Sequence, residues 1–104
     1  MTSGVGEQLQ IDLADVSAVK DENNGFKWLL FCINIFSKKA WVVLLKTKSA
    51  KTVLDGFKLI LAKSGLKPMY VQSDKGTEFT NRLFQGFLKR ENTLFHNRER
   101  VNQG

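Results

Sequence analysis

Cysteine and histidine are nearly absent from this chain of 104 residues, which contains one of each, Cys32 and His96. A single cysteine rules out a framework of disulfide bonds within the chain. One cysteine and one histidine also cannot build a zinc site of the Cys and His type. Any metal ion that this chain binds by itself must therefore be held by oxygen atoms. Cys32 lies in the apolar run 28–33 and is predicted to be a core residue.

Long apolar segments are missing as well. No stretch approaches the roughly 18 apolar residues that mark a membrane span, and no charged and then apolar leader stands at the start of the sequence. We therefore expect an intracellular protein without a membrane partner.

The residues that are present are typical of one small globular domain. Hydrophobic residues make up 42% of the chain, with eight Phe and two Trp, so a core is expected. The net charge of +6 favours a polyanionic partner. A basic domain that is merely soluble carries the same charge, so both interpretations stay open.

The first half of the chain predicts three strands. Apolar and polar residues alternate from Leu9 to Leu13, the pattern of a half-buried strand, and this places Asp12 in mid-strand. The turn-forming segment 20–25, which ends in Asn-Gly, predicts a hairpin. The next strands, 26–36 and 40–45, are apolar at nearly every position and need cover on both faces.

The second half predicts two helices, each followed by a strand. Ser49 is the expected N-cap of the first helix, which ends before Gly65. A short strand follows at 69–73. Thr80 is the expected N-cap of the second helix, and a fifth strand is expected at 92–96. The buried stripe of the second helix is predicted to be Phe84, Phe87 and Leu88.

This order of elements predicts an α/β fold with a mixed sheet: a meander of three strands and then two strands parallel to the first. Crossovers between parallel strands are right-handed in about 98% of cases. Both helices then lie on one face, and the other face needs cover from a partner chain or from sequence absent here. We expect residues 1–6 to be a flexible N-terminus, 7–96 to be the core and 97–104 to be a tail.

Two aspartates are the main candidates for chemistry. Asp74 follows the strand 69–73 and precedes a Lys-Gly turn, while Asp12 lies inside the first strand. If these strands are neighbours, the two carboxylates need a cation between them, and oxygen ligands favour Mg²⁺ or Mn²⁺. Nucleic acid would be a fitting substrate. Asp74 alone is equally well explained as a turn residue, whereas Asp is rare inside strands.

Four segments in register resemble the integrase catalytic core of retroviruses, retrotransposons and Maverick/Polinton-type transposons. They are Gln-Ile-Asp-Leu-Ala-Asp (10–15), Phe-Ser-Lys-Lys-Ala-Trp (36–41), Lys-Thr-Lys-Ser (46–49) and Asp-Lys-Gly-Thr-Glu-Phe (74–79). The resemblance implies a ribonuclease-H-like fold with strand order 3-2-1-4-5, here without the C-terminal helices of the family. It also implies that Asp12 and Asp74 hold Mg²⁺ or Mn²⁺, which activates water or a DNA 3′ hydroxyl for attack on a phosphodiester. A DNA partner and a nuclear location follow from the same resemblance.

The third carboxylate of the family is where this sequence departs from the pattern. The sequence Glu-Arg-Val-Asn at 99–102 echoes the family's Glu-Arg-x-Asn, but only 24 residues separate Asp74 from Glu99, fewer than in the family. Either Glu99 is a displaced third catalytic residue on a shortened connection, or it is a charged residue in a frayed tail. The five residues after it are too few for the helix that normally carries it.

A basic helix face is the second candidate site. Arg82, Gln85 and Lys89 recur on one side of the second helix and, with Lys75, could contact nucleic-acid phosphates. A solvated helix face explains them equally well. Glu78 is interpreted as a complement to the positive start of the helix.

The leading hypothesis is therefore a transposon- or retrovirus-derived integrase core for DNA strand transfer, truncated or decayed, whose third carboxylate is displaced or missing. The alternative is a non-catalytic remnant that binds nucleic acid, or that pairs with itself or a related integrase through the uncovered sheet face. A small ribonuclease-H-like nuclease, which cleaves without joining, is a third possibility.

Overall fold

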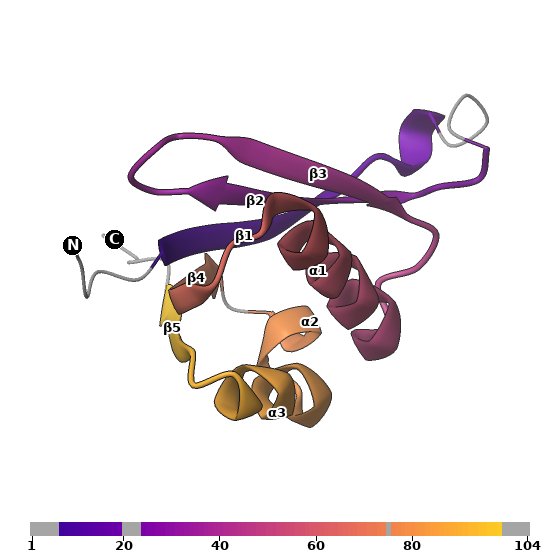
Figure 1. Ribbon diagram of the computed structural model, residues 1–104. Coiled ribbons are helices and arrows are strands. Elements are labelled where there is room, and N and C mark those ends of the chain that lie inside the picture. The colour runs from indigo at the N-terminus through magenta and orange to yellow at the C-terminus, as the bar shows by residue number, and fades with distance from the viewer. Residues whose placement is uncertain (1–6, 20–23, 75, 99–104) are drawn as a thin grey trace, which may run out of the picture.

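The computed structural model describes residues 7–19, 24–74 and 76–98, which form one five-stranded sheet with helices on one side (Figure 1). The strand order is β3-β2-β1-β4-β5, as predicted. In chain order the elements are β1 (Glu7–Asp15), a 3-10 turn (Ser17–Val19), β2 (Trp28–Asn34), β3 (Ala40–Leu45), α1 (Ala50–Ser64), β4 (Pro68–Asp74), α2 (Thr77–Thr80), α3 (Arg82–Arg90) and β5 (Leu94–Arg98).

The pairing of the strands confirms a mixed sheet. β1 and β2 are antiparallel, as are β2 and β3. β4 runs parallel to β1, and β5 runs parallel to β4. Each parallel pair is joined through helices, and α1, α2 and α3 all lie on the same side of the sheet (Figure 1). This arrangement confirms the prediction of helices on one face.

The covered face of the sheet, which packs against the helices, carries the core. Leu9 and Ile11 on β1, and Leu30 and Cys32 on β2, are fully buried. They meet aromatic residues of the helices, where the Phe57 ring lies 5.4 Å from Phe84 and 6.3 Å from Phe87. The apolar residues of β1 therefore fix which side of the strand faces inward.

The opposite side, called here the open face, carries the alternate residues of the same strands. Gln10 on β1 is half-buried and accepts a hydrogen bond of 3.4 Å from Gln72 on β4. On β3, Val42 is 60% exposed and Leu44 is 40% exposed. No helix in the described part of the chain covers this face, as the handedness of the crossovers predicted.

The helix ends partly differ from the prediction. Ser49 caps α1, where it accepts a hydrogen bond from Thr52 N, and Gly65 ends the helix with a left-handed φ of 74°. The predicted cap Thr80 is wrong, because Asn81 accepts from Phe84 N at 2.8 Å and starts α3. Asn can also donate, and its amide closes the separate short helix α2 through hydrogen bonds to the carbonyls of Thr77 and Glu78.

The strand ends also shift. β2 is shorter than the predicted 26–36, while β5 begins and ends two residues later than the predicted 92–96. His96 therefore lies inside β5. The expected flexible segment 1–6 lies outside the described residues, and the domain limits remain predictions.

Candidate active site

The backbone brings the two candidate aspartates to the same level of two adjacent parallel strands. The parallel register pairs Ile11 with Ser73, and the next residue on each strand is Asp12 or Asp74. β4 ends at Asp74, so this level marks the carboxyl end of the central parallel pair. Neighbouring strands lie about 4.8 Å apart. Functional sites of open α/β sheets lie at such carboxyl ends.

The side chain of Asp12 belongs to the open face. Ile11 and Leu13, its neighbours on β1, belong to the side that meets the helices, and successive residues of a strand point to opposite faces. Asp12 is half-buried and stands opposite Phe31 of β2. Its Oδ1 accepts a hydrogen bond of 2.9 Å from Leu13 N. The side chain of Asp74 lies outside the described part of the structure.

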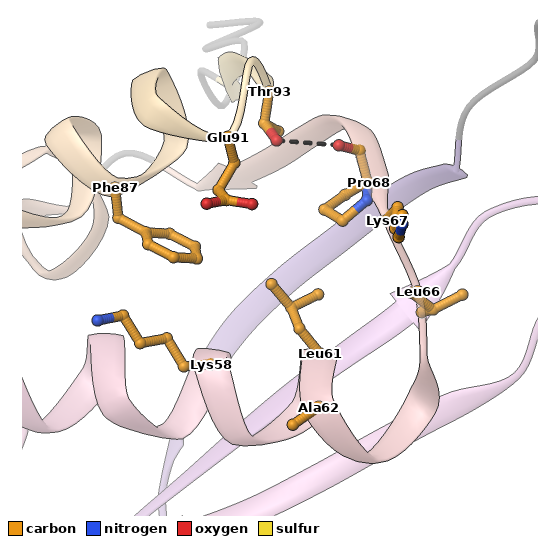
Figure 2. A pocket seen from close by; sticks show the side chains of 9 residues that line it. All are labelled: Lys58, Leu61, Ala62, Leu66, Lys67, Pro68, Phe87, Glu91 and Thr93. Atoms are coloured by element: carbon orange, nitrogen blue, oxygen red, sulfur yellow. Dashed lines mark hydrogen bonds between the residues drawn. The ribbon is translucent and has the colours of Figure 1, made fainter.

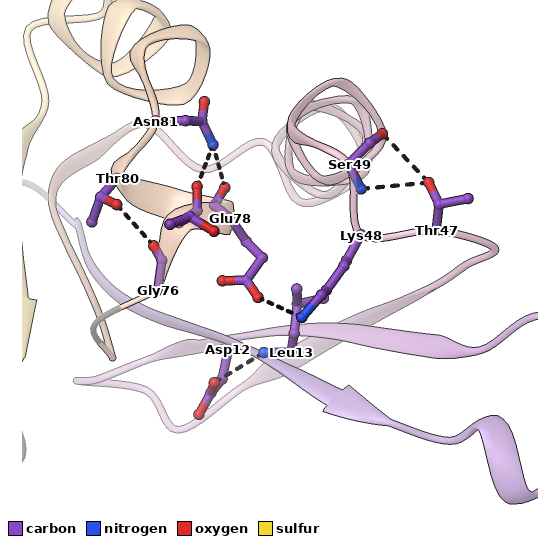
Figure 3. A network of polar contacts seen from close by, with 10 residues as sticks. Asp12, Leu13, Thr47, Lys48, Ser49, Gly76, Glu78, Thr80 and Asn81 are labelled. Carbon is purple, nitrogen blue, oxygen red and sulfur yellow. Dashed lines mark hydrogen bonds and ion pairs between the residues drawn. The ribbon is translucent and has the colours of Figure 1, made fainter.

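A lysine from a different part of the chain approaches this end of the sheet. Lys48, in the connection between β3 and α1, places its Nζ 3.4 Å from Oε2 of Glu78 on α2 (Figure 3). The same Nζ lies 4.9 Å from the centre of the Trp28 ring. One cation thus contacts side chains from β2 and from the short helix that follows β4.

Asp15 ends β1 close to this lysine. Hydrogen bonds from the side chain and backbone of Ser17 lower the pKa of Asp15, and the charge of Lys48 lowers it further. Because Asp15 is exposed and already bonded to Ser17 N at 2.8 Å, the structure accounts for it as a residue that ends the strand.

The predicted phosphate-contacting residues lie in different settings. Arg82 and Lys89 are exposed on α3, and their role remains a prediction. Gln85 donates its side-chain amide to the carbonyl of Phe79 at 2.7 Å, so it ties α3 to α2. Lys75 and Glu99 lie outside the described residues.

The donor atoms at the strand ends suit a hard divalent cation. Carboxylate oxygen is the ligand type that Mg²⁺ and Mn²⁺ prefer, and the backbone register brings Asp12 and Asp74 to one level. Within the described residues no group of three or more His, Cys, Asp or Glu side chains is close enough to hold a metal. Asp12 offers one carboxylate of this ligand type at the level where β4 ends.

A cavity of about 500 Å³ lies elsewhere, between the ends of α1 and α3 (Figure 2). It is lined by Lys58 and Leu61 of α1, by Phe87 of α3, and by Pro68, where β4 begins. Asp74 stands at the opposite end of β4. The cavity is therefore separate from the candidate site.

The strand order β3-β2-β1-β4-β5 is the one that the resemblance to integrase catalytic cores implied. The sequence matches the family model of the integrase core domain over residues 3–100, so this chain belongs to the integrase core domain family. It is also 36% identical over 66 residues to an uncharacterised transposon-derived protein of Caenorhabditis elegans. That match covers 64% of this chain and 23% of the nematode protein.

Solved structures share the fold. The integrase catalytic core domain of HTLV-2, in a trimeric form in complex with magnesium, superposes with a TM-score of 0.77 at 19% identity, over 89% of this chain and 60% of that one. A dimeric form of the same domain superposes with a TM-score of 0.74 at 17% identity, over 90% of this chain and 61% of that one. The intasome of simian T-cell lymphotropic virus with a PP2A regulatory subunit gives 0.77 at 15% identity, over 89% of this chain and 32% of that chain. At these identities the likeness shows the fold alone.

The sequence did not predict the contact between Lys48 and Glu78. Both residues belong to segments that carried the family resemblance, at 46–49 and 74–79. Those segments are far apart in sequence, and only the packing of α2 beside the β3–α1 connection brings them together. Glu78 does lie in the first turn of α2, as its interpretation as a helix-start residue requires.

Proposed function

We propose that this chain is the core of a DNA integrase that performs metal-dependent strand transfer and 3′-end processing. The observation that carries the proposal is the placement of Asp12 and Asp74 at one level of two parallel strands, in the fold of the integrase core domain family. The nematode relative, whose name describes it as transposon-derived, supports a role in DNA integration.

In this proposal Asp12 and Asp74 hold Mg²⁺ or Mn²⁺. The bound ion would supply an activated oxygen nucleophile and would stabilise the negative charge that develops at the phosphodiester. Asp12 contributes a carboxylate held at a fixed place, because its Oδ1 is bonded to Leu13 N and its backbone lies in the middle of the sheet. The exposed Arg82 and Lys89 and the net charge of +6 would draw DNA toward the protein.

A strand-transfer and nicking assay with labelled DNA and Mg²⁺ tests this function. The Asp12→Asn and Asp74→Asn variants should lose activity, since each keeps its side-chain size but gives up a charged metal ligand. The control is Asp55→Asn, which removes an exposed carboxylate paired with Lys51 on α1 and should leave activity unchanged. Equal activity in wild type and Asp12→Asn would refute the proposal. Cleavage without joining would favour a nuclease instead.

A second candidate function rests on the open face. Val42 and Leu44 expose apolar side chains beside the half-buried Phe31 and Ile33, so this side suits association with a second copy or a related integrase. The HTLV-2 core domain was solved in dimeric and trimeric forms. Sedimentation at micromolar protein concentrations tests the idea, and a monomer with no dye-binding apolar surface would exclude it.

A further inference from the structure

The ion pair between Lys48 and Glu78 joins two segments that are far apart in the sequence. Lys48 lies in the connection that leads into α1, and Glu78 lies on α2, four residues after Asp74. The glutamate side chain is only 20% exposed, and the lysine side chain is 52% exposed. The face of the Trp28 ring limits where the lysine can move.

The segment that carries Glu78 is anchored at a second point. Phe79 is 3% exposed, and its ring lies 5.5 Å from Phe84 in an edge-on contact. The amides of Phe79 and Thr80 both donate to the carbonyl of Gly76 at 3.1 Å. Core packing therefore holds the middle of α2, while the Glu78 side chain extends toward Lys48 (Figure 3).

Gly76 shows how closely the glutamate follows this turn. Its φ of −166° is extended backbone that any residue can adopt, so backbone conformation does not require glycine here. A Cβ at position 76 would instead collide with Oε1 of Glu78. Lys48 lies 3.4 Å from the other carboxylate oxygen, so a Cβ at position 76 would displace the same carboxylate that forms the ion pair. The glycine two residues after Asp74 thus leaves room for the Glu78 carboxylate.

We propose that Lys48 and Glu78 are positioning residues that hold the start of α2, and with it the carboxyl end of β4, at a fixed place beside β1. The proposal rests on the metal-binding role assigned above to Asp12 and Asp74. A partly exposed ion pair adds little to global stability. Its effect should therefore appear in how tightly the site binds a cation rather than in the melting temperature.

The test measures Mn²⁺ binding by calorimetry and amide hydrogen exchange without metal, in the full chain. Glu78→Gln should bind Mn²⁺ about 3- to 5-fold more weakly, since a partly exposed ion pair is worth at most about 1 kcal/mol. Exchange of the Phe79 and Thr80 amides should rise about threefold, as loss of a partly exposed ion pair predicts. Gly76→Ala should reproduce both effects. The melting temperature should stay at the wild-type value.

Three further variants separate positioning from a general loss of charge. Lys48→Met should match Glu78→Gln, and the double variant should be no worse than either single change, because both remove the same pair. Lys48→Arg should restore most of the affinity. Asp55→Asn, which breaks the exposed Lys51 pair of 3.0 Å, should behave as wild type.

The outcomes distinguish this proposal from the function on which it rests. Wild-type exchange and Mn²⁺ affinity in Glu78→Gln, together with weakened binding in Asp12→Asn, would overturn the positioning role alone. Faster exchange with unchanged Mn²⁺ affinity would overturn it as well. Failure of Asp12→Asn to weaken Mn²⁺ binding would overturn the metal site itself.

Discussion

The two faces of the sheet are built from the same strands but differ in what they do. On β1, Leu9 and Ile11 are fully buried under the helices, while Gln10 and Asp12 are half-buried on the open face. The covered face contains apolar side chains and aromatic contacts. The open face pairs Gln10 with Gln72 and carries the candidate catalytic carboxylate. The buried residues of the covered face therefore specify the fold, while the open face carries the carboxylate that is proposed to bind the metal ion.

The difference follows from the two-residue period of a strand. Neighbouring residues must point to opposite sides, so a carboxylate placed between two core residues is turned away from the core without any distortion of the strand. This is how Asp12, between Ile11 and Leu13, avoids the cost of burial among apolar groups. Ile11 in the core and Leu13 packed against it then fix the backbone on either side of Asp12.

The largest expected effect on stability is at the centre of the covered face. Phe57 is fully buried and contacts two other rings. Phe57→Ala should lower the free energy of unfolding by about 3 to 5 kcal/mol.

The variant compared with it on the open face is Val42→Thr, which keeps β-branching at a site that is 60% exposed. It should change stability by less than about 0.5 kcal/mol. Chemical denaturation measures both, and similar losses would show that the open face is covered in solution.

A smaller effect on stability comes from the ionisation of a buried thiol on the covered face. Burial raises the pKa of the Cys32 thiol from 9.0 to about 12. In the unfolded chain the thiol loses its proton near pH 9, whereas the folded chain keeps it. The contribution of this thiol to the free energy of unfolding is therefore fully present below pH 9. It falls as the pH rises toward 12, by about 1.4 kcal/mol per pH unit.

Denaturation between pH 8 and about 11 checks this slope. The Cys32→Ala variant should be less stable at pH 8 because of the lost sulfur, but its stability should fall less steeply with pH than that of the wild type. Parallel pH curves for the two proteins would mean that water reaches Cys32 and that the covered face is less closed than described.

The smallest expected effect compares two glycines inside helices. Gly86 on α3 has open space where a Cβ would lie, so Gly86→Ala should stabilise the protein by about 0.5 to 1 kcal/mol. At Gly56 on α1 a Cβ would stand 3.0 Å from Leu45 and 3.1 Å from Leu30, on the covered face. Gly56→Ala should stabilise the protein less than Gly86→Ala does, or should destabilise it. A larger gain at Gly56 would contradict the close packing of α1 on the sheet.

Much of the fold could be predicted from local patterns. Alternation along β1, the apolar runs of β2 and β3, and the cap at Ser49 each depend on neighbouring residues only. Together with the handedness of crossovers they fix strand order and the uncovered face. Asp12 was recognisable as a candidate site residue because a carboxylate inside a strand is unusual.

Other features depend on contacts that no local pattern encodes. Thr80 and Asn81 are adjacent and both suit a helix cap. Asn81 is the cap because its amide also closes α2, and this requires the turn at Gly76. The pairing of Lys48 with Glu78 joins segments that are 30 residues apart in the sequence, so only tertiary packing reveals it.

Asp12 is proposed to bind the metal ion from within β1, at the level where β4 ends. The most direct measurement is a calorimetric titration of Mn²⁺ into the wild-type chain and the Asp12→Asn variant, with Asp55→Asn as a control. We predict saturable binding to the wild type and the control, and binding at least about tenfold weaker in Asp12→Asn. Equal Mn²⁺ affinity in all three proteins would contradict the account.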